Sequence, residues 1–323
     1  MSPVAAFVRS DPRPVPSSEL RCRDLLPLVA EQAAAADHTR DVAPAVIAAI
    51  KASDLLALSA GKELGGLDGT VTEIALELEA LAPACASTAW CVWNHLSVFH
   101  LFCEVLGPPH GDLLGGIVGR HEWCCFPGGA GSRVYGRVEA DDMVIDGPAS
   151  FGSGSRYADW TGVAFAVVDP ATGRPASPPE LRFSLVELDR AGVRIERTWD
   201  GAALRASSTD HILYEHVRLP GDRWAPWWGA DRAVQLRDPA EPVLSARYRE
   251  DWVGLSDLWL AAMAVGIVGA ALEETVEEVG GRRAIMGRSM RDLPGVHFNL
   301  GRAALAVTSA RASASAASAI CRR

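Results

Sequence analysis

The stretch FGSGS at residues 151–155, followed by ADW at 158–160, is the part of the sequence that most narrows the fold. Segments that alternate apolar and polar residues surround it, so it is expected at the end of a β-strand. Its glycines would let the backbone approach a flat ligand closely, and Ser153 and Ser155 offer hydroxyl and amide groups to it. A glycine-rich β-turn without a ligand is the alternative interpretation of this spacing.

Around this stretch, the hydrophobic patterning predicts an α+β chain in three parts. We expect an N-terminal helical domain over 1–117, a central β domain over 118–222, and a linker with further helices over 223–323. Apolar residues at three- and four-residue spacing predict helices at 20–37, 42–58, 71–81, 87–102, 255–279 and 296–320. Alternation between turn signals predicts strands at 134–138, 143–145, 160–168, 181–188, 193–197 and 211–219.

Composition favours an ordinary globular protein. The chain has 323 residues, of which 49% are hydrophobic and 22% charged, and its formal net charge is −9. At ~150 residues per domain, this length predicts about two domains with a sizeable core. The apolar fraction argues against disorder. The acidic balance weighs against a general nucleic-acid or anionic-membrane binder.

The cysteines and apolar runs indicate a cytoplasmic protein. The 7 cysteines form no C-x-x-C pair, so neither a disulfide framework nor a zinc ribbon is expected. The longest uncharged run, 258–272, is shorter than the ~20 residues of a membrane span and is expected to be a core helix. The first residues lack the apolar region of a signal peptide.

The predicted helix at 87–102 carries residues suited to catalysis. It holds Trp93, Asn94, His95 and His100 in a mostly apolar sequence. A histidine suits proton transfer when it faces a cavity, although on an apolar helix it is more often a satisfied core residue. The five-residue spacing of His95 and His100 does not match a chelating i, i+4 pair, so no protein-ligated metal is expected.

Six segments resemble, in the same order, motifs of the acyl-CoA dehydrogenase fold. They are GKELGGL at 61–67, ASTAW at 86–90, SFGSGS with its following ADW at 150–160, TWDGAALRASSTD at 198–210, VRLP at 217–220 and RAIMG at 283–287. The third looks like the corresponding stretch of the group D two-component flavin-dependent monooxygenases, the branch with the oxygenases of hydroxyphenylacetate and dibenzothiophene.

This resemblance implies a fold and a reaction. The fold has an N-terminal helical domain, a central antiparallel β-barrel or sandwich, and a C-terminal helical domain. Only two helices fit between residues 255 and 323 where the fold normally has four, so the last domain is expected to be incomplete. The reaction is hydroxylation of a small aromatic or natural-product molecule by O2 and reduced flavin, FMN or FAD, which a separate flavin reductase supplies. The resemblance also implies a homo-oligomer, a dimer or tetramer.

The resemblance assigns roles to residues as well. Ser153, with Ser155 second, would hydrogen-bond to the flavin, and either His95 or His100 would exchange a proton with the substrate. The cofactor-binding set also includes Trp93, Asn94, Trp199, Arg205 and Arg283, and the two arginines would meet flavin phosphates. The small-residue tail at 296–323 is expected to pack on a neighbouring subunit or to fray.

Two alternatives remain open. An acyl-CoA dehydrogenase would need a carboxylate base, and Asp257 is the candidate on a core-facing helix. A shortened, non-catalytic homologue would bind a ligand or partner without redox turnover.

Overall fold

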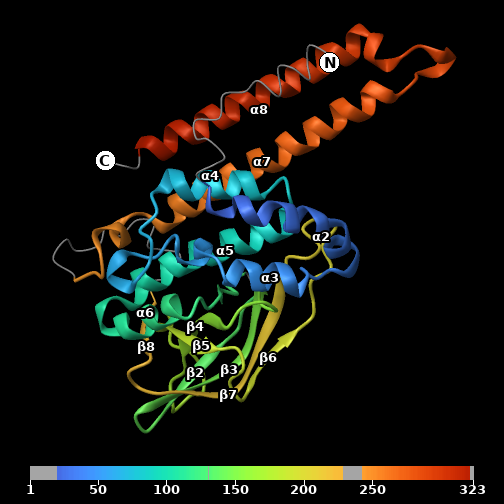
Figure 1. The fold of residues 1–323 in the computed structure, drawn as a ribbon. Helices are drawn as coiled ribbons and strands as arrows, with labels where there is room; N and C mark the ends of the chain where they lie inside the picture. The colour runs from blue at the N-terminus through green and yellow to red at the C-terminus, as the bar shows by residue number, and fades with distance from the viewer. Residues whose placement is uncertain (1–19, 130, 228–241, 321–323) are drawn as a thin grey trace.

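The computed structural model describes residues 20–129, 131–227 and 242–320. Figure 1 shows a helical body with a β-sheet below it and a two-helix arm above it that projects past the body. This helical, β and helical order confirms the predicted α+β fold class. The predicted domain boundaries fall in the last turn of α6 (Gly111–Gly119) and just after β7 (Asp210–Leu219), and the division into domains stays a prediction.

The helical body is built around α5 (Ala86–Leu106), most of whose side chains are buried. The other elements of the body are η2 Arg21–Leu25, α2 Leu26–Thr39, α3 Pro44–Lys51, η3 Asp54–Ala57, η4 Lys62–Leu64, α4 Val71–Leu81 and η5 Pro108–His110. A capping box between Thr70 and Glu73 starts α4 where the sequence predicted it. The predicted single helix over 42–58 is instead α3 followed by η3, because the side chain of Ser53 caps a new 3-10 turn.

Within the described residues, eight strands form one sheet of order β6-β7-β3-β2-β4-β5-β8, with β1 beside β4. The strands other than β7 are β1 Cys124–Cys125, β2 Tyr135–Glu139, β3 Asp142–Gly152, β4 Trp160–Val167, β5 Leu181–Glu187, β6 Val193–Glu196 and β8 Trp224–Pro226. The β1–β4 and β2–β4 pairings are parallel, so the sheet is mixed and the prediction of a wholly antiparallel domain is wrong in these two pairings. β3 runs to Gly152, which places the start of the 151–155 stretch at its end, as predicted.

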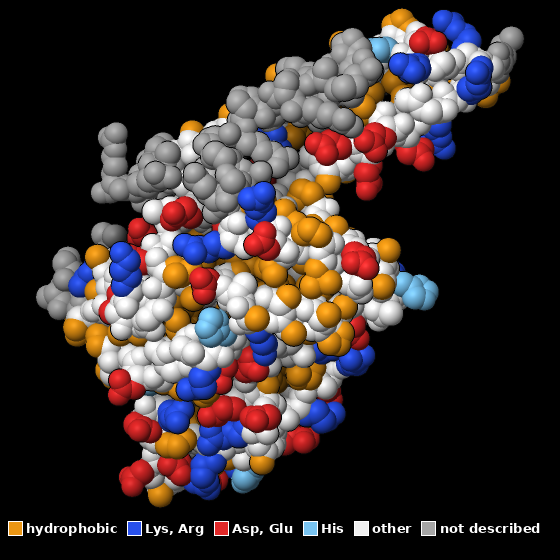
Figure 2. Space-filling model, in the orientation of Figure 1, with side chains coloured by type: hydrophobic (Ala, Val, Ile, Leu, Met, Phe, Trp, Pro, Cys, Tyr) orange, Lys and Arg blue, Asp and Glu red, His pale blue; other side chains and the backbone are white. Residues whose placement is uncertain are grey.

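The outer face of the sheet carries intermixed acidic and basic side chains, as the lower part of Figure 2 shows. Many of them form cross-strand ion pairs. Arg137 contacts Asp146 at 2.9 Å, and Arg218 contacts both Asp142 and Glu139. Because these pairs are exposed, each contributes little to stability.

The arm consists of α7 (Trp252–Gly281) and α8 (Pro294–Ile320), joined by η8 Ile285–Gly287 and η9 Met290–Asp292 and preceded by η7 Ala246–Arg249. α7 crosses α4 closely at Gly266, where an added Cβ would lie 2.3 Å from the carbonyl oxygen of Glu79. Within the described residues, α7 is the one helix long and apolar enough to cross a membrane, and 50% of its most apolar window is buried inside the protein. That burial fits the predicted core helix.

Candidate functional site

Three segments that lie far apart in the sequence meet where α5 faces the sheet. We call this the motif junction and define it as residues 87–94, 150–156 and 204–210. The Ser87 hydroxyl accepts the amide N–H of Ala206 at 3.2 Å, and the amide N–H of Gly154 donates to the carbonyl oxygen of Ser207 at 2.8 Å. The segments that resemble three separate family motifs therefore form one structural unit.

Ser153 lies at the centre of the motif junction with only 4% of its surface exposed. Its Oγ accepts a hydrogen bond from the indole Nε1 of Trp90 at 2.8 Å and lies 3.0 Å from Oγ1 of Thr209. Thr209 Oγ1 is in turn 2.7 Å from Oγ of Ser207. Gly154, next in the chain, adopts φ +78°, which favours glycine and turns the backbone back towards residue 207.

Ser155 faces the protein interior. It is fully buried, and its hydroxyl donates to the carbonyl oxygen of Ser208 at 2.9 Å. This contact holds the 151–155 stretch against the 204–210 segment. The structure thus brings Ser153 and Ser155 to the same junction and commits the Ser155 hydroxyl to a backbone partner.

A buried ion pair between Arg156 and Asp210 fixes the same two segments. Arg156 Nε lies 2.6 Å from a carboxylate oxygen of Asp210, which is completely buried. The other oxygen of Asp210 accepts the amide N–H groups of Thr198 and Trp199, both at 2.9 Å. Burial alone would raise the pKa of Asp210, but the hydrogen bonds from Arg156 and the amides outweigh it and lower that pKa. Arg156 also pairs with Asp41, and so ties the sheet to the turn after α2.

Asn94 and Trp93 lie on α5 one turn after Trp90. Asn94 is four residues from Trp90 and so lies on the same face of the helix. It is 9% exposed, and its Oδ1 has no hydrogen-bond partner among the described residues. The indole N–H of Trp93 donates to the carbonyl oxygen of Ser256 on α7 at 3.0 Å. Asn94 therefore keeps an acceptor free one turn after Trp90, whereas the N–H of Trp93 is used to join two helices.

Trp199, Arg205 and Arg283 lie outside this polar centre. Trp199 is half-buried, and its indole N–H donates to the carbonyl oxygen of Leu204 at 2.9 Å. Arg205 turns towards α2, where its Nε donates to the carbonyl oxygen of Asp37 at 3.0 Å. Arg283 is exposed at the α7–α8 connection, which Figure 1 places at the far end of the arm. The structure of one chain does not bring Arg283 to the motif junction.

His95 uses both of its ring nitrogens to join the helical body to the sheet. Nδ1 accepts the amide N–H of Cys124 at 2.9 Å, and Nε2 lies 2.9 Å from the carbonyl oxygen of Leu56. Since Nδ1 accepts, Nε2 carries the proton and the ring is neutral. The side chain is 1% exposed, and burial lowers its pKa to about 4.

His100 has the opposite environment. It is completely buried, and neither ring nitrogen has a hydrogen-bond partner within the described part of the chain. The rings of Tyr248 and Trp259 flank it with centroids at 5.1 and 6.4 Å. Burial lowers its pKa to about 3, so it is neutral at pH 7 and a weak base. At 1.5 Å per residue, it lies about 15 Å along α5 from Trp90.

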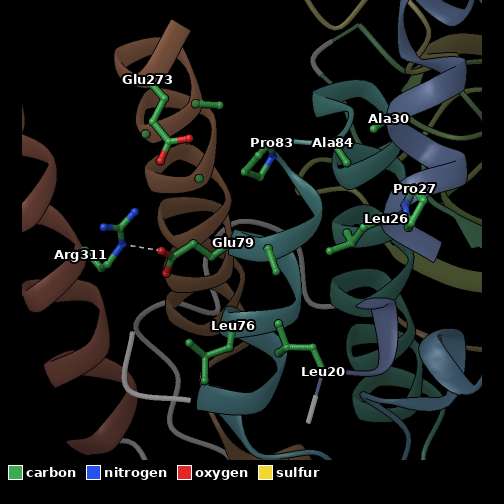
Figure 3. A pocket seen from close by; sticks show the side chains of 14 residues that line it. Leu20, Leu26, Pro27, Ala30, Leu76, Glu79, Pro83, Ala84, Glu273 and Arg311 are labelled. Carbon is green, nitrogen blue, oxygen red and sulfur yellow. Dashed lines mark hydrogen bonds and ion pairs between the residues drawn. The ribbon is translucent and has the colours of Figure 1, made fainter. Parts of the chain in front are cut away.

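Two cavities adjoin the arm, and the predicted site residues line neither of them. The first, of about 480 Å³, lies between α2, α4, α7 and α8. Figure 3 shows its mostly apolar wall and the ion pair between Arg311 of α8 and Glu79 of α4, which are 2.5 Å apart. The second is an apolar groove of about 930 Å³ between α7 and α8. Across the described residues, no three His, Cys, Asp or Glu side chains are grouped to hold a metal ion.

The motif junction offers the groups that a flat heteroaromatic ring would need. Ser153 and the unpartnered Oδ1 of Asn94 supply hydrogen-bonding atoms. Phe151 is 49% exposed and adopts φ +67°, an unusual conformation for a non-glycine residue. It presents an exposed aromatic surface two residues before Ser153 in the chain, against the ring of His211. These residues fit the ring portion of a flavin.

The comparisons with known proteins agree with this geometry. Residues 24–105 match the acyl-CoA dehydrogenase N-terminal domain, and residues 258–322 match the acyl-CoA dehydrogenase C-terminal domain. The two helical parts of the chain thus match domains of the acyl-CoA dehydrogenase family. This confirms the resemblance inferred from the six motifs.

Similar curated proteins include monooxygenases and dehydrogenases. The chain is 26% identical to the indole-3-acetate monooxygenase of Pseudomonas putida over 85% of its own length and 66% of that protein. It is also 26% identical to the mitochondrial short-chain specific acyl-CoA dehydrogenase of Mus musculus, over 80% of the chain and 60% of the relative. The chain thus spans about two thirds or less of these curated relatives.

Among solved structures, XiaF from Streptomyces sp., in complex with FADH2 and glycerol, has the same fold. Its TM-score is 0.79 at 20% identity, and the alignment covers 98% of this chain and 74% of XiaF.

Sequence reasoning missed Trp90 as a partner of Ser153, and it missed Thr209 and Asp210. Trp90 and Asp210 occur within the quoted motifs. Their partners, Ser153 and Arg156, lie in another motif or beside it, and only the structure shows which of these residues are close in space. The available signal for Asp210 was its place at the end of the TWDGAALRASSTD motif, five residues after Arg205.

Proposed function

We propose that this chain is the oxygenase component of a two-component flavin-dependent monooxygenase, which hydroxylates a small aromatic or natural-product molecule. The observation that carries the proposal is the motif junction, where the Ser153 hydroxyl lies on one of the resembling motifs and the unpartnered Oδ1 of Asn94 lies one helical turn after another. The monooxygenase relative and the FADH2-bound structural neighbour support it. Bound reduced flavin would supply the activation of O2.

The protein's own contribution would be binding, orientation and exclusion of water. Ser153 and Asn94 would hydrogen-bond to the flavin ring, with Ser155 holding the loop that carries Ser153. Trp93 and Trp199 would limit access of water to that ring from α5 and from the 198–205 loop. Because burial makes His100 a weak base, its neutral ring would orient the substrate by hydrogen bonding between α5 and α7. His95, whose nitrogens are both engaged, would support α5.

The remaining contacts would come from other molecules. A separate reductase would deliver the reduced flavin, FMN or FAD, and the protein would work in the cytoplasm. Arg205 would approach a flavin phosphate from its place beside α2. Arg283 lies at the end of the arm, so it would reach a flavin only on a neighbouring subunit of a homo-oligomer.

The acyl-CoA dehydrogenase alternative has less support from the described residues. Its candidate base, Asp257, is exposed on α7, whereas the neighbouring Ser256 is the residue that faces α5. The proposal and this alternative differ in the flavin they hold. A dehydrogenase would purify with oxidised FAD that an acyl-CoA bleaches.

Anaerobic titration of the purified chain with reduced FMN and reduced FAD tests the proposal. We expect saturable binding of at least one of them, followed by substrate-dependent O2 consumption when air is admitted. Ser153→Ala should weaken binding about ten-fold. Ser184→Ala, a buried β5 serine that bonds to the carbonyl oxygen of Arg223, should not change it. Absence of binding of either reduced flavin would overturn the proposal and leave the non-catalytic alternative.

A further inference from the structure

Ser153 is held from two sides by groups that come from different parts of the chain. Trp90 Nε1, from α5, donates to its Oγ at 2.8 Å. Thr209 Oγ1, from the segment before β7, lies 3.0 Å away on a separate element. A serine hydroxyl has one proton and two lone pairs, so these two neighbours take up all but one of its hydrogen-bonding directions.

Thr209 is itself fixed by a second buried hydroxyl. Ser207 Oγ lies 2.7 Å from Thr209 Oγ1, and Ser207 is completely buried. Ser207 is anchored in turn, because its carbonyl oxygen accepts the amide N–H of Gly154 and the thiol of Cys91. The hydroxyls of Ser207, Thr209 and Ser153 therefore form a hydrogen-bonded chain. It begins at Ser207, whose backbone is anchored, and ends at Ser153.

The oxygen–oxygen distances agree with either direction of donation along this hydroxyl chain. When Ser207 donates to Thr209 and Thr209 donates to Ser153, Ser153 accepts twice and its own proton is left for a ligand. When Ser153 donates to Thr209, the proton is used inside and Ser153 keeps a lone pair for a ligand. In both directions Trp90 can only donate, because an indole nitrogen has no lone pair to offer.

We propose that Trp90 and Thr209 are positioning residues for Ser153. Their two hydrogen bonds leave the Ser153 hydroxyl one free hydrogen-bonding direction, which points towards the ligand. In that direction the hydroxyl can either donate or accept. This inference rests on the proposed function, because it takes the ligand to be the flavin ring. Neither residue needs to touch the flavin for this role.

The test uses Trp90→Phe, which keeps the aromatic ring and removes the N–H, and Thr209→Val, which keeps the shape and removes the hydroxyl. Each should raise the Kd for reduced flavin in anaerobic titration about ten-fold. Thr209→Ser, which restores a hydroxyl, should return the Kd to within about two-fold of the unaltered chain. The matched controls are Trp160→Phe, whose N–H bonds to Glu122, and Thr161→Val, whose hydroxyl bonds within β4. Both controls should leave the Kd unchanged.

A double-mutant cycle separates positioning from a general loss of structure. In a Ser153→Ala background, Trp90→Phe and Thr209→Val should change the Kd less than about two-fold, because they act through the missing hydroxyl. Effects of the same size with and without Ser153 would overturn the inference, as would variants that bind like the unaltered chain. If the unaltered chain binds neither reduced flavin, the proposed function itself is refuted, and the positioning roles of Trp90 and Thr209 are not the cause.

Discussion

The two halves of α5 have opposite environments. The first half, residues 86–95, is joined to the sheet and its loops by three hydrogen bonds, in which Ser87 and His95 accept and Trp90 donates. The second half, residues 96–106, packs mainly against apolar and aromatic side chains, and His100 lies there without a hydrogen-bond partner among the described residues. The hydrogen bonds of the first half hold its groups in place and leave the Oδ1 of Asn94 for a ligand, whereas in the second half the whole imidazole of His100 has no partner among the described residues. The first half therefore fixes the ring site, and the second half is where we expect the substrate.

The largest effect should come from breaking the ion pair that supports the first half. Asp210→Ala leaves Arg156 buried without its closest partner and frees the amides of Thr198 and Trp199, so the free energy of unfolding should fall by about 3–5 kcal/mol. Urea unfolding measures this. Glu196→Ala removes the partner of an exposed pair with Arg194 and should cost less than about 1 kcal/mol. Equal costs for the two variants would show that the junction is no more tightly held than the surface.

Acid should destabilise the protein through both histidines of α5. In the unfolded chain a histidine takes up a proton near pH 6.5, but folded His95 does so only near 4 and folded His100 near 3. The folded pKa is the lower one, so the stability is present above pH 6.5 and is lost as the pH falls. Each histidine should account for a loss of about 3 kcal/mol by pH 4.

Urea unfolding at pH 7, 5.5 and 4.5 measures that loss. Replacing either buried histidine by Phe should flatten the pH dependence, whereas His38→Gln, at an exposed position on α2, should leave its slope unchanged. A slope that is the same for the unaltered chain and both Phe variants would refute the assignment.

His95→Phe should be destabilising at neutral pH as well. The substitution leaves the buried N–H of Cys124 and the carbonyl oxygen of Leu56 without partners, so we expect a cost of about 2 kcal/mol. The ring of Phe keeps the contacts with Phe99 and Trp123, which isolates the hydrogen bonds as the cause. An unfolding free energy equal to that of the unaltered chain would mean that α5 is not joined to β1 in this way.

The sequence was sufficient for the elements whose own residues determine them. The Thr70–Glu73 capping box and the periodicity of 71–81 are local, so α4 was predicted with its correct ends. The prediction of one helix over 42–58 was wrong because the capping contact of Ser53 competes with the helical pattern. The glycine-rich α6 was not predicted, because glycine lowers helix propensity.

The site could be predicted only in part, for a different reason. The motifs assigned Ser153 and Ser155 to the flavin, and the helix at 87–102 suggested Asn94, but periodicity could not separate His95 from His100. The difference between them depends on partners 29 and 39 residues from His95, at Cys124 and Leu56, which no local pattern reveals. Likewise, the groups that Arg205 and Arg283 can contact depend on where α2 and the arm lie, which no local pattern reveals.

The smallest change in stability should come from His100→Phe. Replacing a buried, unpartnered imidazole by an apolar ring of similar shape removes unsatisfied polar atoms and adds little volume, so the free energy of unfolding at pH 7 should stay within about 1 kcal/mol. The Kd for reduced flavin should also be unchanged, because His100 lies about 15 Å along α5 from Trp90. Only substrate-dependent O2 consumption should fall. Weakened flavin binding by this variant would show that the two halves of α5 belong to one site. Full turnover would show that His100 is an unsatisfied core residue with no part in the reaction.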